Sequence, residues 1–191
     1  MSNIKILNTE ILSNNWYTLK KVTYEILQKG EVLVQNREAY DRGNGATILL
    51  YNKEKQSVIL TRQFRMPTFI NGNASGYLIE ACAGLLDTDN AEDCIRRETE
   101  EETGFKITHV EKIFEAYMSP GSVTEILYFF VAEYTKEMKV TEGGGLEEES
   151  ENIEVLELPF PEALGMIKTG EIMDAKTIML LQYAALNNLL V

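Results

Sequence analysis

A short acidic stretch holds the residues of this sequence whose types and spacing could do chemistry. RRETEEETGF, residues 96–105, contains four glutamates and two arginines. Glu98, Glu101 and Glu102 are spaced i, i+3 and i+4, so on a helix their carboxylates share one face, with Cβ atoms about 5–6 Å apart. Such a cluster repels itself unless a cation lies beside it. A Mg²⁺ site is therefore one interpretation, and a solvated acidic helix face is the other.

Hydrophobic patterning and turn residues predict the elements that must hold this cluster. Strands are expected at residues 16–27, 31–40, 47–51, 58–62, 77–81, 107–117, 126–134 and 153–158. A helix is expected after Gly84, where Asp, Thr and Asn offer capping groups, and Gly104 is expected to end it. Further helices are expected at residues 161–168 and 175–190, and solvated loops at residues 66–76 and 141–152.

This order of elements predicts an α+β fold. Residues 43–191 are expected to form an α-β-α sandwich with a mixed sheet. Residues 1–42 form a separate, strand-rich section that has little core of its own. Such a section is expected to pack against a partner subunit or against the main domain, and a sheet extension within one monomer is the alternative.

Composition and charge exclude several classes of partner. The chain has 191 residues, 45% hydrophobic and 25% charged, which is ordinary for a soluble domain with a full core. Its net charge of -12 argues against nucleic acid or an anionic membrane surface as the main partner. No apolar run approaches the ~20 residues of a membrane span, and the first ten residues do not resemble a signal peptide. We therefore expect a cytoplasmic protein.

Zinc chemistry is excluded by the small number of suitable ligands. Cys82 and Cys94 are the only cysteines, and His109 is the only histidine. One cysteine falls in a predicted strand and the other on the apolar side of a predicted helix, so they do not make a zinc site. Both are expected to be buried, reduced thiols.

Residues 97–105 resemble the second half of the Nudix box. The pattern of that family reads R-E-U-x-E-E-x-G-U, where U is aliphatic or bulky. The matching residues are Arg97, Glu98, Glu101, Glu102, Gly104 and Phe105. A predicted strand before the motif and a helix stopped by glycine agree with the resemblance, which implies the Nudix fold and a metal-dependent hydrolase.

The first half of the box departs from the family pattern. The segment from Gly84 to Arg97 is one residue shorter than usual, and Asp89 occupies the position of a family glutamate. Thr99 stands where an aliphatic residue is common. These departures leave the metal-binding half intact, and they put only the role of Asp89 in question.

The resemblance extends over nearly the whole chain to the nucleotide-sugar pyrophosphatase branch of the family, and within it to bacterial enzymes that act on GDP-mannose. It is carried by REAYDRGNGATILLYN, RQFRMPTFINGN, CAGLLD, YMSPGSVTE, GGGLEEESENIEVLELPF and MIKTGEIMDAKT. It implies hydrolysis of GDP-mannose to GMP and mannose 1-phosphate with Mg²⁺, for which Mn²⁺ could substitute. Hydrolysis of ADP-ribose or another nucleoside diphosphate sugar is the alternative. A sensor that binds without hydrolysis is a third hypothesis, against which the intact glutamates argue.

The same resemblance assigns roles to individual residues. It implies metal ligation by Ala83, through its carbonyl, and by Glu98, Glu101, Glu102 and Glu149. It implies that Arg97 orients the glutamates and that Glu149 or Glu151 is the general base, with Glu149 preferred. The implied substrate contacts are Tyr17, Arg37, Arg65, Gly84, Leu85, Glu125, Lys176 and Thr177. The implied assembly is a homodimer with exchanged N-terminal strands, in which Tyr17 and Arg37 reach the partner's site.

Overall fold

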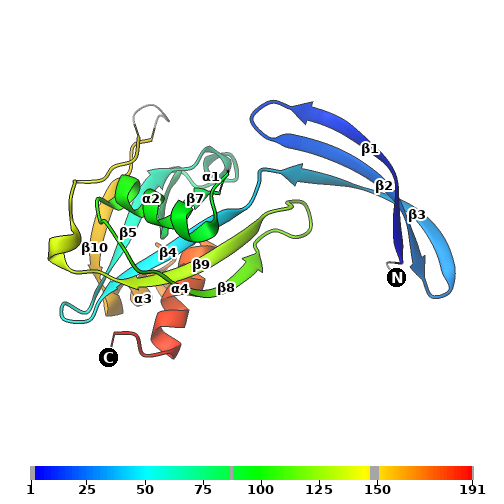
Figure 1. The fold of residues 1–191 in the computed structure, drawn as a ribbon. Coiled ribbons are helices and arrows are strands. Elements are labelled where there is room, and N and C mark those ends of the chain that lie inside the picture. Colours follow the sequence, from blue (N-terminus) through cyan, green and yellow to red (C-terminus); the bar gives the residue numbers. More distant parts are fainter. Residues whose placement is uncertain (1–2, 87, 147–150, 191) are drawn as a thin grey trace. The chain divides into compact units, whose positions relative to one another are not determined.

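The chain divides into two compact units in the computed structural model, which describes residues 3–86, 88–146 and 151–190. We call residues 1–44 with 117–126 the N-terminal unit, and residues 45–116 with 127–191 the core unit. Figure 1 traces the chain through both units in the order of the sequence. Each unit is described by itself below.

The N-terminal unit is built on a three-stranded antiparallel sheet in the order β1-β2-β3 (Figure 1). Its strands are β1 (Ile4–Asn14), β2 (Thr18–Gln28) and β3 (Glu31–Asp41). The hairpin predicted from the sequence is confirmed, and Lys29 and Gly30 at its turn both have positive φ, as tight hairpin turns require. Strand β1 was not among the predicted strands. Its pairing with β2 shifts register twice, and each irregularity interrupts the period-two alternation that marks a strand in sequence.

The core unit contains a seven-stranded mixed sheet. The main path runs β10-β5-β4-β9-β8, with β6 paired to β5 and β7 paired to β4. Strand β4 runs parallel to β9 and antiparallel to β5 and β7. The bounds are β4 (Gly45–Asn52), β5 (Ser57–Phe64), β6 (Tyr77–Glu80), β7 (Cys82–Leu85), β8 (Glu111–Tyr117), β9 (Ile126–Glu133) and β10 (Glu154–Pro159). Every residue of β4 is buried, which explains why its sequence is almost continuously apolar.

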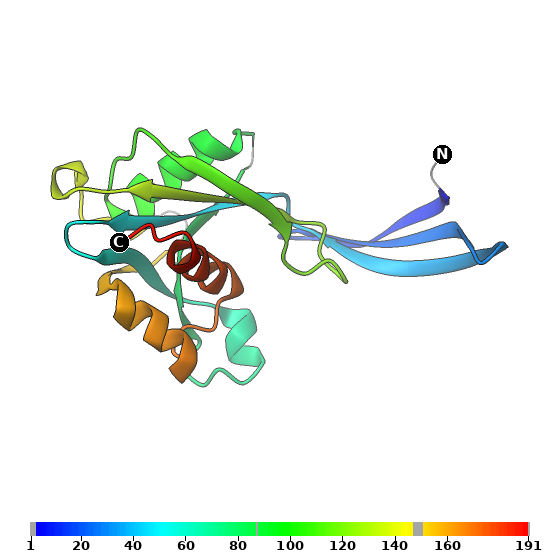
Figure 2. The ribbon, with the colours of Figure 1, turned by 90° about the horizontal axis from the view of Figure 1, so that it is seen from below.

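Helices cover both faces of this sheet, so the predicted α-β-α sandwich is confirmed. Helix α2 (Ala91–Thr103) lies on one face, and α3 (Phe160–Thr169) and α4 (Ala175–Leu186) lie on the other (Figure 2). Under α2, the core includes Ile48, Leu50 and Phe130, none more than 1% exposed. Within the part of the chain that the structure describes, no helix has both the length and the apolar composition needed to cross a membrane.

The structure corrects several expected boundaries. The expected loop at residues 66–76 is wrong at its start, because α1 (Met66–Ile70) forms there with Pro67 in its first turn. A short 3-10 helix, η1 (Lys136–Met138), follows β9. Strand β8 begins at Glu111 rather than at residue 107, since Ile107 is buried without joining the sheet. Helix α4 ends at Leu186, two residues before Asn188 takes a left-handed conformation.

Candidate active site

Helix α2 fixes the position of the acidic cluster through capping at both ends. At its start, the side-chain oxygen of Asn90 accepts hydrogen bonds from the backbone N–H groups of Glu92 and Asp93, at 3.1 and 3.0 Å. At its end, Gly104 has φ +79° and donates to the carbonyl of Glu100 at 3.0 Å. The predicted stop at Gly104 is therefore confirmed, and the glutamates occupy the second half of the helix.

Strand β7 meets the buried side of this helix at two of the predicted metal ligands. The residue Glu102 is only 2% exposed, and its Oε2 accepts a hydrogen bond from the backbone N–H of Ala83 at 3.4 Å. The Glu98 side chain is 15% exposed and lies against Gly84, where a Cβ atom would overlap its carboxyl group. Glycine at position 84 therefore makes room for the carboxylate. The structure thus brings Ala83, Gly84, Glu98 and Glu102 together.

Burial makes both of these carboxylates costly to ionise. Burial raises the pKa of Glu102, a hydrogen bond from the Cys82 thiol lowers it, and the nearby charges of Glu98 and Glu151 raise it, so that this pKa is about 8. Burial also raises the pKa of Glu98 to about 7, with Arg97 opposing the shift and the charges of Glu101 and Glu151 adding to it. The cluster is therefore a partly buried set of mutually repelling anions that calls for positive charge.

Arg97 supplies part of that charge. Its Nη2 lies 3.0 Å from Glu98 Oε1, its Nη1 lies 2.9 Å from Glu101 Oε2, and its Nε lies 3.6 Å from Asp89 Oδ2. Burial alone would lower the pKa of Arg97, but Glu98 and Glu101 outweigh it and raise that pKa above its ordinary value. The planar guanidinium joins three carboxylates, as its fork of donors allows. Asp89, whose role the sequence left open, is one of these partners.

Threonine at position 99 replaces an aliphatic residue without leaving a polar atom unsatisfied. Thr99 is fully buried, and its hydroxyl donates to the carbonyl of Ile95 one turn earlier. The Cys82 thiol faces the same hydroxyl at 4.0 Å. Cys82 and Cys94 are both buried and neither forms a disulfide, which confirms the predicted thiols. Burial raises the pKa of Cys82 well above its ordinary value, so this thiol stays protonated.

The loop before β10 brings a further carboxylate towards the cluster. Glu151 Oε2 accepts a hydrogen bond from the backbone N–H of Leu146 at 3.1 Å. Its charge acts on both Glu98 and Glu102, since it raises the pKa of each. Glu149, the preferred base from the sequence, lies outside the described residues, as does the rest of residues 147–150 of the expected loop.

The donor chemistry of the cluster fits Mg²⁺. Glu98, Glu101 and Glu102 offer hard carboxylate oxygens, and the buried anions need a counter-charge. Among residues 3–86, 88–146 and 151–190, no three acidic, histidine or cysteine side chains are gathered closely enough to hold one ion. Arg97 draws the carboxylates of Glu98 and Glu101 to itself. Metal ligation by the expected residues therefore stays a prediction.

Two of the predicted substrate contacts converge on a carboxylate that sequence reasoning missed. Glu80 has a side chain only 3% exposed and receives two hydrogen bonds from Arg65, at 2.8 and 3.1 Å, and one from Lys176. Lys176 also lies 3.0 Å from Asp174. Burial opposes ionisation of Glu80, but Lys176 and Arg65 outweigh it and hold the pKa of Glu80 below its ordinary value. A charged residue in the short apolar strand YLIE was the signal that could have revealed it.

Two other predicted substrate contacts have partners inside the core unit. Thr177 is fully buried, and its hydroxyl hydrogen-bonds to Asp174 Oδ2 at 2.6 Å and to the backbone N–H of Ala81 at 2.6 Å. The carbonyl of Leu85 accepts a hydrogen bond from the Cys94 thiol at 3.1 Å. These hydrogen bonds join Ala81, between β6 and β7, to the start of α4, and Leu85, the last residue of β7, to α2.

The remaining predicted contacts belong to the N-terminal unit. The ring of Tyr17 packs edge-on against Tyr40, with centroids 5.7 Å apart, and the guanidinium of Arg42 lies 5.6 Å from its centroid. Arg42 also pairs with Glu125 at 3.5 Å, so Tyr17 and Glu125 are neighbours of one arginine. Arg37 is exposed, and its Nη1 donates to the carbonyl of Asn36.

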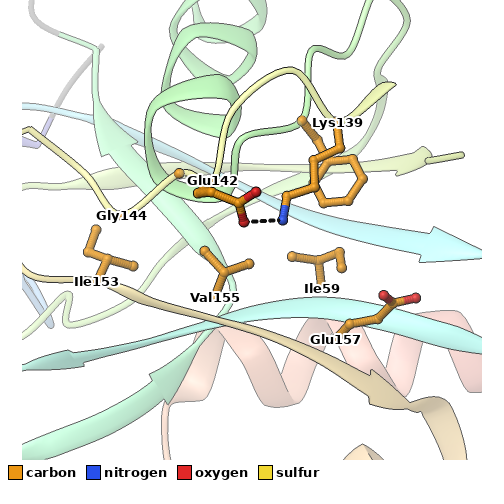
Figure 3. A pocket seen from close by; sticks show the side chains of 9 residues that line it. Ile59, Lys139, Glu142, Gly144, Ile153, Val155 and Glu157 are labelled. Atoms are coloured by element: carbon orange, nitrogen blue, oxygen red, sulfur yellow. Dashed lines mark hydrogen bonds and ion pairs between the residues drawn. The ribbon is translucent and has the colours of Figure 1, made fainter. Parts of the chain in front are cut away.

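Two pockets lie on either side of the glycine-rich segment that follows β9. A pocket of about 460 Å³ opens beside the acidic cluster, between the exposed side of α2 and this segment. It is lined by Arg97, Glu100, Glu101, Thr141, Gly143, Gly145 and Leu146. The second, of about 430 Å³, has an apolar floor that includes Ile59 and Val155, and an ion pair between Lys139 and Glu142 lies over that floor (Figure 3). The first is lined by Arg97 and Glu101 of the motif, and the second by its last residue, Phe105.

Comparison with known proteins agrees with this geometry. Residues 41–181 match the family model described as the NUDIX domain, and residues 3–40 match the model of the GDP-mannose pyrophosphatase NudK N-terminal domain. The chain is 58% identical over 188 residues to a GDP-mannose pyrophosphatase from Enterobacter sp. (strain 638), covering 98% of this chain and 97% of that protein. It is 57% identical, with the same coverage, to a GDP-mannose pyrophosphatase from Shigella flexneri serotype 5b (strain 8401).

A solved structure supports the fold independently of sequence. The chain resembles the crystal structure of an ADP compounds hydrolase with a TM-score of 0.74 at 19% identity, covering 100% of this chain and 98% of that one. The mixed sheet and the helices that cover it are therefore shared with a known fold. The chain belongs to the NUDIX family, and it carries the N-terminal domain described for GDP-mannose pyrophosphatase NudK.

Proposed function

We propose that this chain hydrolyses the diphosphate bond of GDP-mannose and releases GMP and mannose 1-phosphate. The observation that carries the proposal is the pair of solvent-shielded carboxylates Glu98 and Glu102 on α2, with the charge of Glu151 acting on both. Support for the substrate comes from relatives named GDP-mannose pyrophosphatase that are 57–58% identical over nearly the whole chain. A diphosphate needs positive charge, and the carboxylate oxygens of the cluster are of the kind that a divalent cation would accept as ligands.

The box glutamates would hold Mg²⁺, or Mn²⁺ in its place, with the carbonyl of Ala83 as a further ligand. When bound, the metal neutralises charge on the diphosphate and makes water more acidic. Arg97 keeps Glu98 and Glu101 oriented through its two short ion pairs. Gly84 leaves the space that the Glu98 carboxylate fills. These residues position the reacting groups, which is where much of the catalysis of phosphoryl transfer originates.

We assign the general base to the loop carboxylate Glu151, with Glu149 as the alternative. Glu151 takes a proton from the attacking water while the water oxygen bonds to one phosphorus. The bridging P–O bond breaks, and its electron pair leaves with the other phosphate. A general base of this kind contributes about 100-fold to 10,000-fold to the rate.

We propose that a few arginine and lysine side chains make the local charge at the substrate positive, although the protein as a whole is strongly acidic. Arg65 and Lys176 carry positive charge next to Glu80, and Arg65 is 40% exposed and able to reach a phosphate. Arg37 offers a further guanidinium, Tyr17 a ring for stacking on the base, and Glu125 a hydrogen-bond acceptor. Gly84, Leu85 and Thr177 complete the proposed contacts.

We propose a homodimer formed through exchanged N-terminal strands, and a cytoplasmic location. The support is the exposure of apolar side chains in the N-terminal unit, which is large for side chains of their type: Ile6 65%, Ile11 61%, Val32 64% and Val34 62%. Two buried cysteines that form no disulfide agree with a reducing compartment. Sedimentation of an active monomer would overturn the assembly.

The substrate is tested by comparing rates at equal concentrations of GDP-mannose, ADP-ribose and other nucleoside diphosphate sugars with Mg²⁺. We expect GMP and mannose 1-phosphate to form fastest. Faster release of AMP from ADP-ribose would contradict the proposed substrate while keeping the reaction. Binding of nucleotide sugars without any turnover would contradict catalysis and favour a sensor.

The base and the site of attack need separate measurements. We expect Glu151→Gln to lose most of its kcat and Glu149→Gln to lose less, because the Glu151 charge acts on both buried glutamates. The reverse order would transfer the role to Glu149. Reaction in ¹⁸O-labelled water shows which product carries the label and hence which phosphorus is attacked.

A further inference from the structure

Three consecutive glycines bind the loop before β10 to the end of helix α2. Gly143, Gly144 and Gly145 have φ values of +71°, +113° and +79°. The N–H of Gly144 donates to the carbonyl of Glu102 at 2.9 Å, and that of Gly145 donates to the carbonyl of Glu101 at 3.1 Å. Carbonyls in the last turn of a helix have no partner within the helix, so this segment supplies one.

The same segment holds the side chain of Glu151. Two hydrogen bonds join Leu146 and Glu151. The Glu151 N–H donates to the Leu146 carbonyl at 3.2 Å, and the Leu146 N–H donates to Glu151 Oε2 at 3.1 Å. The N–H of Ile153 donates to the carbonyl of Gly144 at 3.1 Å. A Cβ atom at Gly145 would overlap Glu151 Oε2. The Glu151 carboxylate therefore occupies the space that the missing side chain of Gly145 leaves open.

We propose that Gly145 is a positioning residue for the reaction: its bare backbone binds the helix carbonyl of Glu101 and leaves the space in which the Leu146 N–H fixes the Glu151 carboxylate. The backbone thus links the loop carboxylate to the helix that bears the box glutamates. A rigid link of this kind matters because small displacements of a catalytic group are costly in rate. The inference rests on the proposed function, in which Glu151 is the base.

Gly144 provides a matched control. It also has positive φ and donates to a helix carbonyl, and its φ of +113° makes alanine there at least as strained as at Gly145. A Cβ atom at Gly144 would meet nothing closer than the carbonyl oxygen of Ile153, at 3.7 Å, which is ordinary contact. Both alanine variants are therefore strained, and only Gly145→Ala displaces the Glu151 carboxylate.

The test combines both variants with Glu151→Gln in a double-mutant cycle. We expect Gly145→Ala to lower kcat about 100-fold with KM within about twofold, and Gly144→Ala to keep most of its kcat. In the Glu151→Gln background, Gly145→Ala should lower kcat further by less than about twofold, because the side chain that it displaces no longer acts as a base. Thermal unfolding of each variant corrects for the folded fraction.

Three results would overturn the inference. One is an equal loss of kcat in the two alanine variants, and another is the same loss of kcat from Gly145→Ala whether residue 151 is glutamate or glutamine. The third is undiminished activity of Glu151→Gln. A readout independent of turnover is hydrogen exchange at the Leu146 amide, which should lose protection in Gly145→Ala and keep it in Gly144→Ala. If the wild type cleaves no nucleoside diphosphate sugar, the proposed function fails. The exchange result then decides by itself whether Gly145 fixes Glu151.

Discussion

At the scale of single residues, the site is governed by an imbalance of charge. Glu102 is buried and Glu98 is half-buried, the charge of Glu98 raises the pKa of Glu102, and the charge of Glu151 raises the pKa of both. Arg97 pairs with Glu98, and among the described residues no ion pair joins Arg97 to Glu102. Glu102 is therefore the carboxylate of the cluster that Arg97 does not neutralise.

Replacing Glu102 should remove activity without damaging the fold. We expect Glu102→Gln to lower kcat by about 100-fold or more. The substitution removes a carboxylate proposed to hold the metal ion, which would stabilise the charge of the transition state. The thermal midpoint of the metal-free protein should not fall, because glutamine replaces a carboxyl group that burial makes costly to ionise. The control is Glu100→Gln on the same helix, whose carboxylate faces Lys106 at 3.4 Å. Similar losses in both variants would contradict the assignment.

Arg97 should not be replaceable by lysine. Its guanidinium contacts two carboxylates at 2.9 and 3.0 Å, and an ammonium group cannot reproduce that fork. We expect Arg97→Lys to lower kcat about 10-fold to 100-fold, the usual cost of losing an orienting partner. Arg96→Lys is the matched control, because Arg96 pairs with Glu92 and Asp93 away from the cluster. A nearly unchanged rate in Arg97→Lys would show that orientation of the glutamates does not depend on the fork.

At the scale of elements, α2 must begin and end at fixed residues for its acidic face to meet β7. Asn90 supplies the cap at its start, and Gly104 ends it in the left-handed conformation. The space at Gly84 then accommodates Glu98. A change at the cap weakens the helix without touching the carboxylates.

We expect Asn90→Ala to cost about 1 kcal/mol in the free energy of unfolding, because two backbone N–H groups lose their acceptor. In a chain of this size the thermal midpoint should fall by about 2–4 °C. Asn90→Ser should keep most of the stability, since serine also caps helices. Denaturant titration measures the difference, and kcat per folded molecule should be unchanged. Equal stabilities of the alanine and serine variants would contradict the capping role.

At the scale of the whole molecule, the fold shifts the pKa values of two acidic sites in opposite directions: it lowers that of Glu80 and raises those of Glu98 and Glu102. Glu80 is held ionised by Lys176 and Arg65, so its stabilising contribution is present at neutral pH and is lost on acidification through its lowered pKa. Glu98 and Glu102 have pKa values near 7 and 8 in the folded chain, against an ordinary value of 4.5. Between these values the folded state binds more protons than the unfolded state, so stability falls as the pH rises.

The metal-free protein should therefore be most stable in mildly acidic solution. With a chelator present, we expect the thermal midpoint to decrease steadily from about pH 5 to about pH 9. The slope should be shallower in Glu102→Gln, which lacks the group with the higher pKa. A profile without slope in the wild type, or the same slope in the variant, would contradict this account.

Sequence patterns predicted the structure correctly where the interacting residues lie close together in the chain. The i, i+3, i+4 spacing of the glutamates, the glycine stop and the apolar strand β4 follow from local geometry, and the predicted sandwich of helices on a mixed sheet is confirmed. Strand β1 and helix α1 were missed because bulges and a short turn of helix break the simple periods. The roles of the site residues remain predictions that the experiments above test.

The sequence by itself determined the family, the acidic helix face and the residue types available for a metal and a diphosphate. Only the tertiary structure decided which groups meet: Glu80 with Arg65 and Lys176, and Glu151 with the space at Gly145. These contacts join residues that are distant in sequence, and their effects depend on burial, which no local pattern reports. The pKa values follow the same division, because the charge of a glutamate is set by the solvent and the ions that the fold leaves around it.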